Sequence, residues 1–434
     1  MRIGNSDQIY ILTSKLQDYT IFISAVLLTA STMSMAIYAY SPLPWWDYWE
    51  VVILDDNLEN LFTRHNEHFI LVPRIFYALD TVFASATGRF SLGAIWFFHI
   101  GVFLCMYFVL SEGMSAWRRI TAFGITAAFM FSGRHLENLS WPFQVGFVGL
   151  AFVACTAIIL TSMSSPANKK YAVMGAFAAG SAPLWSFHGL IVPLVCAIIA
   201  IISRKYVVAI INLSFLVAAS TLYLVAPNGN SEPLFVNASL DIRKILTSYI
   251  NQIGYGPAFP FLDGGNPPLL VAATLTVIVT IIPAALFVKS LTVSVRDPSR
   301  SSRLLSIFGI MLFSYGTLAA ISLGRTSVDP VFEPAHRYFI YSAMLWAPAL
   351  FLASSFLRPP LAKSMSVSIM LIFLMNQTLA YQYCRIWHKQ RQAAALAIVA
   401  DPANITVLHA VHPNPERLRK QVDTLKKANL SVFK

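Results

Sequence analysis

The amino-acid sequence predicts an all-α membrane protein with many transmembrane helices. Apolar residues make up 56% of its 434 residues and charged residues only 12%, about half the charged share of an ordinary soluble domain. The apolar residues also occur in runs close to the roughly 20 residues that a helix needs to cross a bilayer. Membrane topology and anionic headgroups therefore explain the net charge of +11 better than binding to nucleic acid does, and no nucleic-acid partner is expected.

About eleven apolar segments are candidates for transmembrane helices within a membrane domain that spans residues 1–384. The third and the fifth are short enough for tilted or re-entrant helices. The segments are 20–40, 91–111, 119–132, 141–163, 171–182, 189–203, 206–226, 268–290, 304–323, 338–357 and 364–384.

Lys and Arg in the connecting segments predict the orientation. With the N-terminus inside, fourteen of them fall in inner segments and eight in the outer loops, and the positive-inside rule favours this arrangement. The outer loops also hold thirteen of the twenty acidic residues. The N-terminus is therefore expected on the cytoplasmic side.

The first outer loop, residues 41–90, is the most acidic part of the chain. Residues 41–86 alone contain seven carboxylates. Apolar residues recur at helical spacing over 51–62 and again over 69–86, with charged residues between them. We expect two amphipathic helices along the membrane surface, in a loop that carries the chemistry.

Asp47 stands in an aromatic setting, Trp45-Trp46-Asp47-Tyr48-Trp49, directly after the first span. Burial among aromatic rings raises the pKa of a carboxyl group and suits it to general-base catalysis. The alternative is an interfacial aromatic belt in which the acid is incidental. We interpret Asp47 as the catalytic base.

The stretch His65-Asn66-Glu67-His68 has two readings. It is either a proton-transfer or metal cluster, or a polar cap before the helix that starts near Phe69. A zinc site is not expected, because the chain has no His-x-x-x-His pair here. Glu67 is the candidate helper of Asp47.

Other outer turns carry further candidate substrate-binding side chains. Arg325 and Arg337 either clamp a phosphate bidentately or form salt bridges that hold their loop together. Gln144 either orients a hydroxyl group or bonds to a neighbouring helix. The full set of candidate substrate-binding residues is Glu50, His68, Arg74, Glu137, Gln144, His188, Arg325, Arg337 and Tyr338.

Residues 385–434 have the composition of a small soluble tail. The pattern predicts a helix over 390–400, a short strand over 405–409 and a helix that begins at Asn414-Pro415-Glu416 and ends near Ala428. Fifty residues do not easily bury a core of their own. We therefore expect a small α/β appendage on the outer side, docked against the outer loops.

Three short stretches carry a resemblance to a known group of proteins. They are Trp46-Asp47-Tyr48-Trp49 with Asn66-Glu67-His68, then Glu137-Asn138-Leu139-Ser140-Trp141-Pro142-Phe143-Gln144, then Gly324-Arg325 with Arg337-Tyr338. Together with the acidic first loop, they resemble the GT-C superfamily of polyprenyl-phosphate-dependent glycosyltransferases, and within it the bacterial O-antigen-modifying (serotype-converting) glucosyltransferase type.

The resemblance implies a GT-C-like bundle in the bacterial inner membrane, with its active site on the periplasmic side. It implies inverting transfer of one sugar from an undecaprenyl-phosphate donor to a cell-envelope glycan or lipid-linked acceptor. A first-loop acid then matches Asp47, and the outer arginines Arg325 or Arg337 match the ligands of the donor phosphate. Some members add a second acid and a metal; Glu50 or Glu67 would be that acid, and a divalent cation, Mg or Mn, is left open.

Two other functions compete with this hypothesis. One is a transporter or flippase of lipid-linked saccharides, which would place charges near the bilayer midplane on broken helices. The other is an O-antigen polymerase or ligase, for which a concentration of acids in the first loop is not expected. The charges at the ends of the spans and the acidic first loop favour the transferase.

Overall fold

The computed structural model describes residues 5–52, 61–66, 68–227, 241–258, 269–296, 298–325, 336–412 and 414–434. Within these ranges the secondary structure is helical, apart from one isolated bridge between His65 and His68. The predicted all-α class is therefore confirmed for the described part of the chain.

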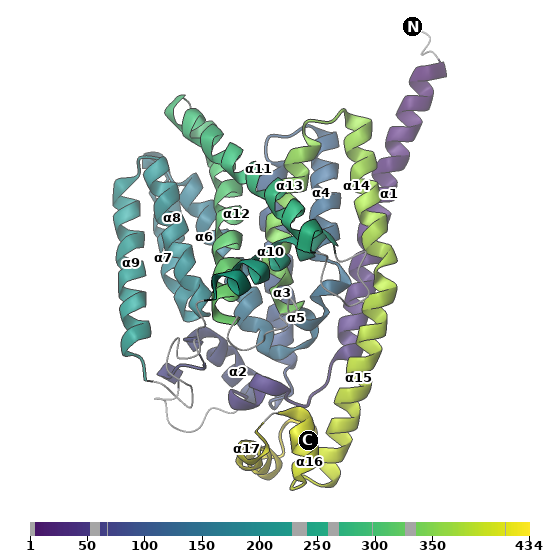
Figure 1. The fold of residues 1–434 in the computed structure, drawn as a ribbon, viewed down its shortest axis with the longest axis vertical. Coiled ribbons are helices and arrows are strands. Elements are labelled where there is room, and N and C mark those ends of the chain that lie inside the picture. Colours follow the sequence, from purple (N-terminus) through teal and green to yellow (C-terminus); the bar gives the residue numbers. More distant parts are fainter. Residues whose placement is uncertain are drawn as a thin grey trace.

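Most of the helices run roughly parallel to one another and form the body of the protein (Figure 1). They are α1 (Asn5–Ala39), α3 (Arg89–Ser111), α4 (Ala116–Met130), α6 (Val145–Met163), α7 (Lys169–Ser181), α8 (Ile191–Ile202), α9 (Tyr206–Val225), α11 (Leu269–Arg296), α12 (Pro298–Arg325), α13 (Phe339–Ser354), α14 (Pro359–Met375) and α15 (Gln377–Ala400). A further helix, α10 (Ile242–Ala258), packs against α11, α12 and α13.

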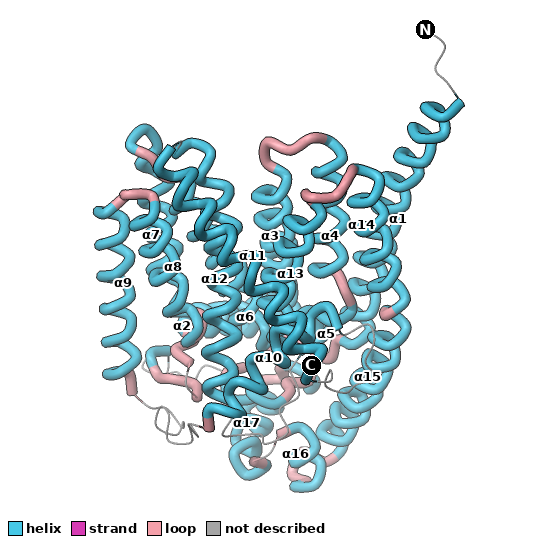
Figure 2. The backbone as a smooth tube through the Cα atoms, turned by 45° about the horizontal axis from the view of Figure 1, so that its top comes forward, coloured by secondary structure: helices cyan, strands magenta, loops and turns pink. Residues whose placement is uncertain are grey.

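Short helices gather at the lower end of the bundle in Figures 1 and 2. They are α2 (Leu71–Ala84), α5 (Leu136–Ser140), α16 (Ile405–Val411) and α17 (Pro415–Lys427). The 3-10 helices η1 (Trp46–Glu50), η3 (Gly133–His135), η4 (Pro142–Gln144), η7 (Phe187–Leu190) and η9 (His336–Tyr338) connect the elements named so far.

Six helical segments of the described chain are long and apolar enough to cross a membrane. They are Leu12–Ala39, Arg89–Ser111, Pro142–Met163, Tyr206–Val225, Ser302–Gly324 and Pro359–Ala400. Each of the eleven predicted segments overlaps a helix, but the count of eleven spans is not confirmed. Several helices are too short: α13 has 16 residues, about 24 Å at 1.5 Å per residue, against a hydrocarbon core of roughly 30 Å.

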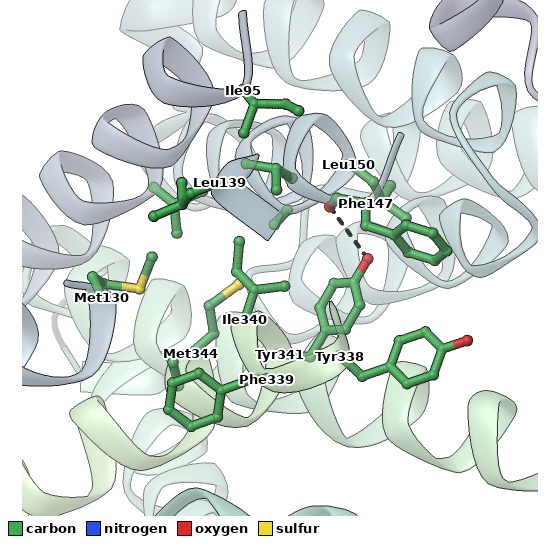
Figure 3. Close-up of a cluster of buried hydrophobic side chains, with 14 of the residues drawn as sticks. Ile95, Met130, Leu139, Phe147, Leu150, Tyr338, Phe339, Ile340, Tyr341 and Met344 are labelled. Atoms are coloured by element: carbon green, nitrogen blue, oxygen red, sulfur yellow. Dashed lines mark hydrogen bonds between the residues drawn. The ribbon is translucent and has the colours of Figure 1, made fainter. Parts of the chain in front are cut away.

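The core is centred on α6. In the most apolar stretch of 18 residues of Pro142–Met163, which contains α6, 78% of the residues are buried inside the protein. The corresponding value for α9, on the periphery, is 17%. Figure 3 shows how α6 meets α13: Phe147 and Leu150 face Tyr341, whose hydroxyl donates a 3.3 Å hydrogen bond to the Phe147 carbonyl oxygen. This contact holds the start of α13 next to the start of α6.

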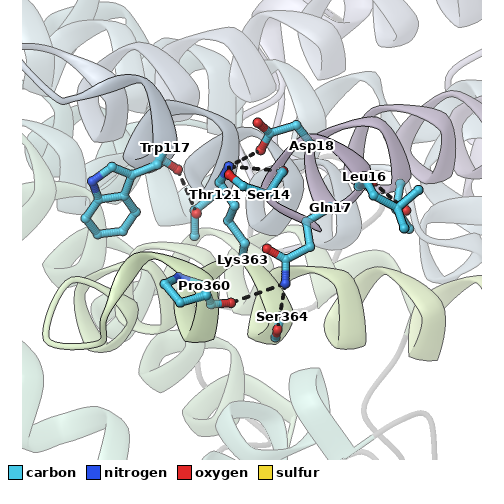
Figure 4. Close-up of polar contacts among 10 residues, drawn as sticks. Ser14, Leu16, Gln17, Asp18, Trp117, Thr121, Pro360, Lys363 and Ser364 are labelled. Carbon is cyan, nitrogen blue, oxygen red and sulfur yellow. Dashed lines mark hydrogen bonds and ion pairs between the residues drawn. The ribbon is translucent and has the colours of Figure 1, made fainter. Parts of the chain in front are cut away.

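At the opposite end, α1 is fastened to α14 (Figure 4). The Lys363 ammonium lies 2.6 Å from an Asp18 carboxylate oxygen and donates to the Ser14 hydroxyl at 2.8 Å. Gln17 donates to the Ser364 hydroxyl at 2.9 Å. Helices α1 and α14 are therefore neighbours although they lie at opposite ends of the chain, and α1 also packs against α15, which follows α14.

A tight turn after α2 sets the direction of α3. Gly88 has φ +82° and packs directly on Pro142, so a side chain there would be both strained and in collision. The Asp80 carboxylate, fully buried, accepts hydrogen bonds from the backbone N–H groups of Gly88, Phe90 and Ser91 at 2.6, 2.7 and 3.2 Å. A carboxylate in this position stabilises the N-terminus of a helix.

The predicted surface helices of the first loop have different outcomes. The helix expected over 69–86 is confirmed as α2, although its bounds are Leu71–Ala84. The helix expected over 51–62 falls mostly on residues 53–60, outside the described residues.

The C-terminal tail is helical, so the predicted α/β appendage is wrong. The strand expected over 405–409 is part of α16, whose N-terminus is capped because the Asn404 side chain accepts from the N–H groups of Thr406 and Val407. The helix cap at Asn404 thus outweighs the preference of the β-branched residues for a strand. The helix expected over 390–400 is the end of α15, which runs unbroken from Gln377, and the last predicted helix is α17.

The tail docks on the first loop, as predicted. The Ser431 N–H donates to the Ser85 carbonyl oxygen at 2.8 Å, and its hydroxyl donates to the Pro42 carbonyl oxygen at 2.6 Å. The Lys434 ammonium donates to the Ser85 hydroxyl at 3.0 Å. Both ends of the first loop are therefore covered by the end of the chain.

Candidate functional site

A cavity of about 1040 Å³ lies where the first loop, the segment around α5, η9 and the tail meet. Its size is at the upper end of the range of small-molecule sites. The residues that line it are Trp45, Trp46, Asp47, Asn66, Glu137, Trp141, Arg337, Trp387, Gln390, Arg391, Ala393, Ala394, Ala397, Thr406, Val407 and Ala410. Three sequence-predicted site residues, Asp47, Glu137 and Arg337, are therefore brought together from distant parts of the chain.

Glu137 and Arg337 form the closest charged pair of the cavity. Glu137 lies in the first turn of α5, and Arg337 lies in η9, just before α13. The guanidinium donates to one carboxylate oxygen at 3.3 Å, and the backbone N–H of Arg337 donates to the other at 3.1 Å. Burial by itself lowers the pKa of Arg337, but Tyr338, Glu137 and Asp47 outweigh it and raise that pKa above its ordinary value. The guanidinium is therefore charged at any physiological pH.

Asp47 occupies the first turn of η1 and is half-buried at the cavity wall. Its neighbours Tyr48 and Trp49 are 2% and 0% exposed, which fixes the short helix in the core. Trp46 has φ +47° and remains half exposed. The turn thus buries the two aromatic residues that follow Asp47, while the Asp47 carboxylate lines the cavity.

Arg391 and Trp387 line the same cavity from α15, and sequence reasoning missed both. Arg391 is 5% exposed, and its Nη1 donates to the carbonyl oxygens of Ala39 and Ser140 at 3.2 Å each. Its guanidinium lies 5.0 Å from the Trp387 ring centroid and 5.9 Å from that of Trp45. The periodicity of α15 could have found it.

That periodicity is a seven-residue spacing of buried positions along α15. Cys384, Arg391 and Ile398 are all buried on a helix that is otherwise largely exposed. A charged residue in register with two buried apolar positions indicates a buried charge, and buried charges are rare without a partner or a function.

Beneath Glu137, Arg134 lies against His336. Its Nη1 is 2.8 Å from the His336 Nδ1. Burial lowers the pKa of Arg134, while Tyr383 and Glu137 act in the opposite direction. Burial and then Arg134 lower the pKa of His336 well below its ordinary value, so the ring is neutral at pH 7 and its nitrogen can accept the hydrogen bond.

Glu50 and Arg74, both predicted to bind substrate, lie outside the lining of the cavity. The Glu50 carboxylate oxygens lie 3.3 Å from His65 Nδ1 and 3.4 Å from His412 Nε2, so it joins the first loop to the tail. Arg74 is 6% exposed and donates through Nη1 to the carbonyl oxygens of Leu61 and Thr63. Burial lowers its pKa to about 10.

His68 and His188 form a separate buried cluster around Ser186. The Ser186 hydroxyl lies 3.3 Å from His68 Nδ1 and 3.2 Å from His188 Nδ1. The Phe187 N–H donates to His68 Nδ1 at 3.3 Å. This cluster ties the first loop to η7 and does not contribute to the cavity lining, so the expected substrate contacts of both histidines stay predictions.

Gln144 and Tyr338 are both buried beside the cavity and not in its lining. Gln144 is 0% exposed. The Tyr338 ring packs edge-on against Phe147 with its centroid 5.7 Å away, and the Arg337 guanidinium lies 5.3 Å from its centroid. Tyr338 therefore positions Arg337 rather than facing the open volume.

Two predicted site residues lie wholly or partly beyond what the structure describes. Glu67, the expected helper of Asp47, lies outside the described residues. Arg325 is the last residue of α12, and its side chain is likewise outside them. Their roles stay predictions.

In the described part of the chain, no three His, Cys, Asp or Glu side chains come together as a metal site. The carboxylates that line the cavity there are Asp47 and Glu137, and Glu137 is held by Arg337. With Arg337 and Arg391, the charged side chains in the lining balance, and Arg134 beneath adds one positive charge. Such a setting attracts a ligand that carries phosphate.

No protein-family model, curated protein or solved structure matches the chain. The site combines two carboxylates, two arginines and four tryptophans around one large cavity.

Proposed function

We propose that the protein is an inverting GT-C-type glycosyltransferase of the bacterial inner membrane. It transfers one sugar from an undecaprenyl-phosphate donor to a cell-envelope glycan or lipid-linked acceptor on the periplasmic face. The observation that carries the proposal is the joint lining of one cavity by Asp47, Glu137 and Arg337, in a bundle whose described residues include six helical segments long enough to cross a membrane.

Each of the three residues has a part in the proposed reaction. Asp47 accepts the proton of an acceptor hydroxyl group. The oxygen of that hydroxyl forms a bond to the anomeric carbon while the bond from this carbon to the phosphate oxygen breaks, and the lipid phosphate leaves with both electrons of that bond. Arg337 stabilises the charge that develops on the phosphate, and Glu137 holds the guanidinium in place.

The aromatic lining supports a sugar as the transferred group. Trp45, Trp46, Trp141 and Trp387 line the cavity. Indole rings offer broad apolar surface with one polar N–H, which suits the apolar faces and hydroxyl edges of a sugar.

The test is transfer of radiolabelled sugar from short-chain polyprenyl-phosphate sugars by the purified full-length protein in vesicles. Wild type and the control Asp423→Asn, which changes an exposed acid of α17, should transfer at equal rates. Asp47→Asn should lose about 10²- to 10⁴-fold, the usual contribution of a general base. Full transfer by a folded Asp47→Asn protein contradicts the assignment, and donor crossing the vesicle membrane without transfer identifies a flippase.

A further inference from the structure

The feature with no part in the reaction described so far is the Arg391 guanidinium. It is 5% exposed, yet it belongs to the lining of the cavity. Its Nη1 makes both of its hydrogen bonds, to the carbonyl oxygens of Ala39 and Ser140. Among the residues that the structure describes, Nε and Nη2 donate to no acceptor.

The unused donors of this guanidinium are available to a ligand in the cavity. Arginine carries five N–H donors and stays charged. The unused donors of Arg391 are not among the fully enclosed polar atoms of the described residues, because the side chain lines the cavity and a ligand there can reach them. The faces of Trp45 and Trp387 stabilise the charge through cation–π contacts, but they accept no in-plane hydrogen bond. The in-plane edge of this guanidinium therefore lacks the partner that a phosphate group would supply.

The Arg391 guanidinium is separate from that of Arg337. Both are attached to the five-residue helix α5, but at opposite ends: Arg337 at the Glu137 carboxylate and Arg391 at the Ser140 carbonyl oxygen. Three residues of helix correspond to about 4.5 Å along its axis. The two arginines also come from different elements, η9 and α15.

We infer that Arg391, held between Trp45 and Trp387, forms a second phosphate subsite in the cavity, distinct from the one at Arg337. The inference rests on the proposed function, because it assigns the Arg337 subsite to the donor phosphate. The cavity of about 1040 Å³ has room for two such groups. The second phosphate belongs either to a lipid carrier or to a soluble group, and the two sources share the same chemistry.

The test is binding to the purified full-length protein in detergent, with no transfer required. The probes are a short-chain polyprenyl phosphate and inorganic pyrophosphate, each titrated alone and with the other at saturation, by quenching of tryptophan fluorescence. The variants are Arg391→Gln, Arg391→Lys and Arg337→Gln. The control is Arg385→Gln, which changes an exposed arginine on the same helix.

We expect both probes to bind at once to wild type and to Arg385→Gln. Arg391→Gln should weaken one probe about tenfold or more, the size expected for charged hydrogen bonds, and Arg337→Gln the other. Arg391→Lys should restore part of the loss, which separates ligand binding from a purely structural role. Loss of pyrophosphate binding in Arg391→Gln indicates that the second phosphate is soluble. Loss of polyprenyl phosphate binding there instead indicates a lipid carrier at Arg391 and moves the donor phosphate away from Arg337.

Two outcomes overturn the inference. In the first outcome the two probes compete with each other, and Arg337→Gln loses the binding of both. This result indicates a single subsite. The other is unchanged binding of both probes by an Arg391→Gln protein that still elutes as a single species. Failure of the proposed function is separate, because the sugar-transfer assay would then be negative while the two-probe binding pattern persists.

Discussion

Glu137 accepts hydrogen bonds from both the backbone and the side chain of Arg337, a residue 200 positions further along the chain, at 3.1 and 3.3 Å. One carboxylate thus fixes the position of η9 as well as the direction of its guanidinium. The pair joins the segment between α4 and α6 to the start of α13, and it stands in the wall of the cavity.

Replacing Glu137 with Gln should impair transfer more than folding. A glutamine keeps an oxygen for the Arg337 N–H but removes the charge that orients the guanidinium, so we expect at least a tenfold loss in the rate of sugar transfer. The measurement is the transfer rate beside the thermal unfolding temperature. Glu416→Gln, at an exposed position of α17, is the control; equal rates for both variants would contradict the role of Glu137.

Gly133→Ala should displace α15 from the site. A Cβ atom at Gly133 would lie 2.3 Å from the Ala380 Cβ and 2.6 Å from the Gln377 Oε1. Overpacking of this kind typically costs about 1–3 kcal/mol of stability. Gly93→Ala, which meets nothing within 4 Å, should leave the protein unchanged or slightly more stable. Thermal unfolding of both variants in detergent is the measurement, and matching temperatures would refute the close approach of η3 and α15.

Asp80→Asn should destabilise the first loop without touching the cavity. The carboxylate accepts hydrogen bonds from three backbone N–H groups at the start of α3. In an asparagine the side-chain oxygen can replace only part of these bonds, and the side-chain NH2 group would face a backbone donor. We expect a loss of about 1–3 kcal/mol in the free energy of unfolding.

Denaturant unfolding measures that loss, with Asp423→Asn as the surface control. Transfer per folded molecule should stay near wild type, because Asp80 does not line the cavity. A selective loss of activity at unchanged stability would instead give Asp80 a part in the reaction.

The protein should become less stable as the pH falls below about 6.5. Burial, and then His99 and Arg134, lower the pKa of His135 well below its ordinary value, although the Phe129 carbonyl oxygen acts against this. The unfolded chain then binds more protons than the folded one between the folded pKa and about 6.5, so stability rises with pH across that window and is lost as the pH falls through it.

The check is the thermal unfolding temperature from pH 5 to pH 8. In a His135→Gln protein the unfolding temperature should depend less on pH, because a glutamine amide does not take up a proton in this range. The control His409→Gln, at an exposed position of α16, should follow wild type. Identical slopes for all three proteins would remove His135 as the cause.

Residue type and local pattern predicted a large part of the helices. The apolar runs placed most of the long helices, and Asn414-Pro415 placed the start of α17. The span expected over 364–384 was divided wrongly, because α14 ends at Met375 and α15 runs from Gln377 to Ala400. The strand expected over 405–409 was wrong because the Asn404 cap turned those residues into a helix. The pattern also did not fix the number of spans, because short helices such as α8, with 12 residues, are as apolar as the longer ones that can cross a membrane.

The sequence by itself determined that this chain is an apolar helical protein with an acidic, tryptophan-rich first loop, because periodicity and composition act within one segment. Only the tertiary structure decided that Asp47, Glu137 and Arg337 share a cavity, that Glu50 joins the loop to the tail, and that Arg391 lines the same cavity. Those relations depend on contacts between residues far apart in the sequence. Such contacts form where α1 packs against α15 and where η9 packs against α5. No local pattern encodes such contacts.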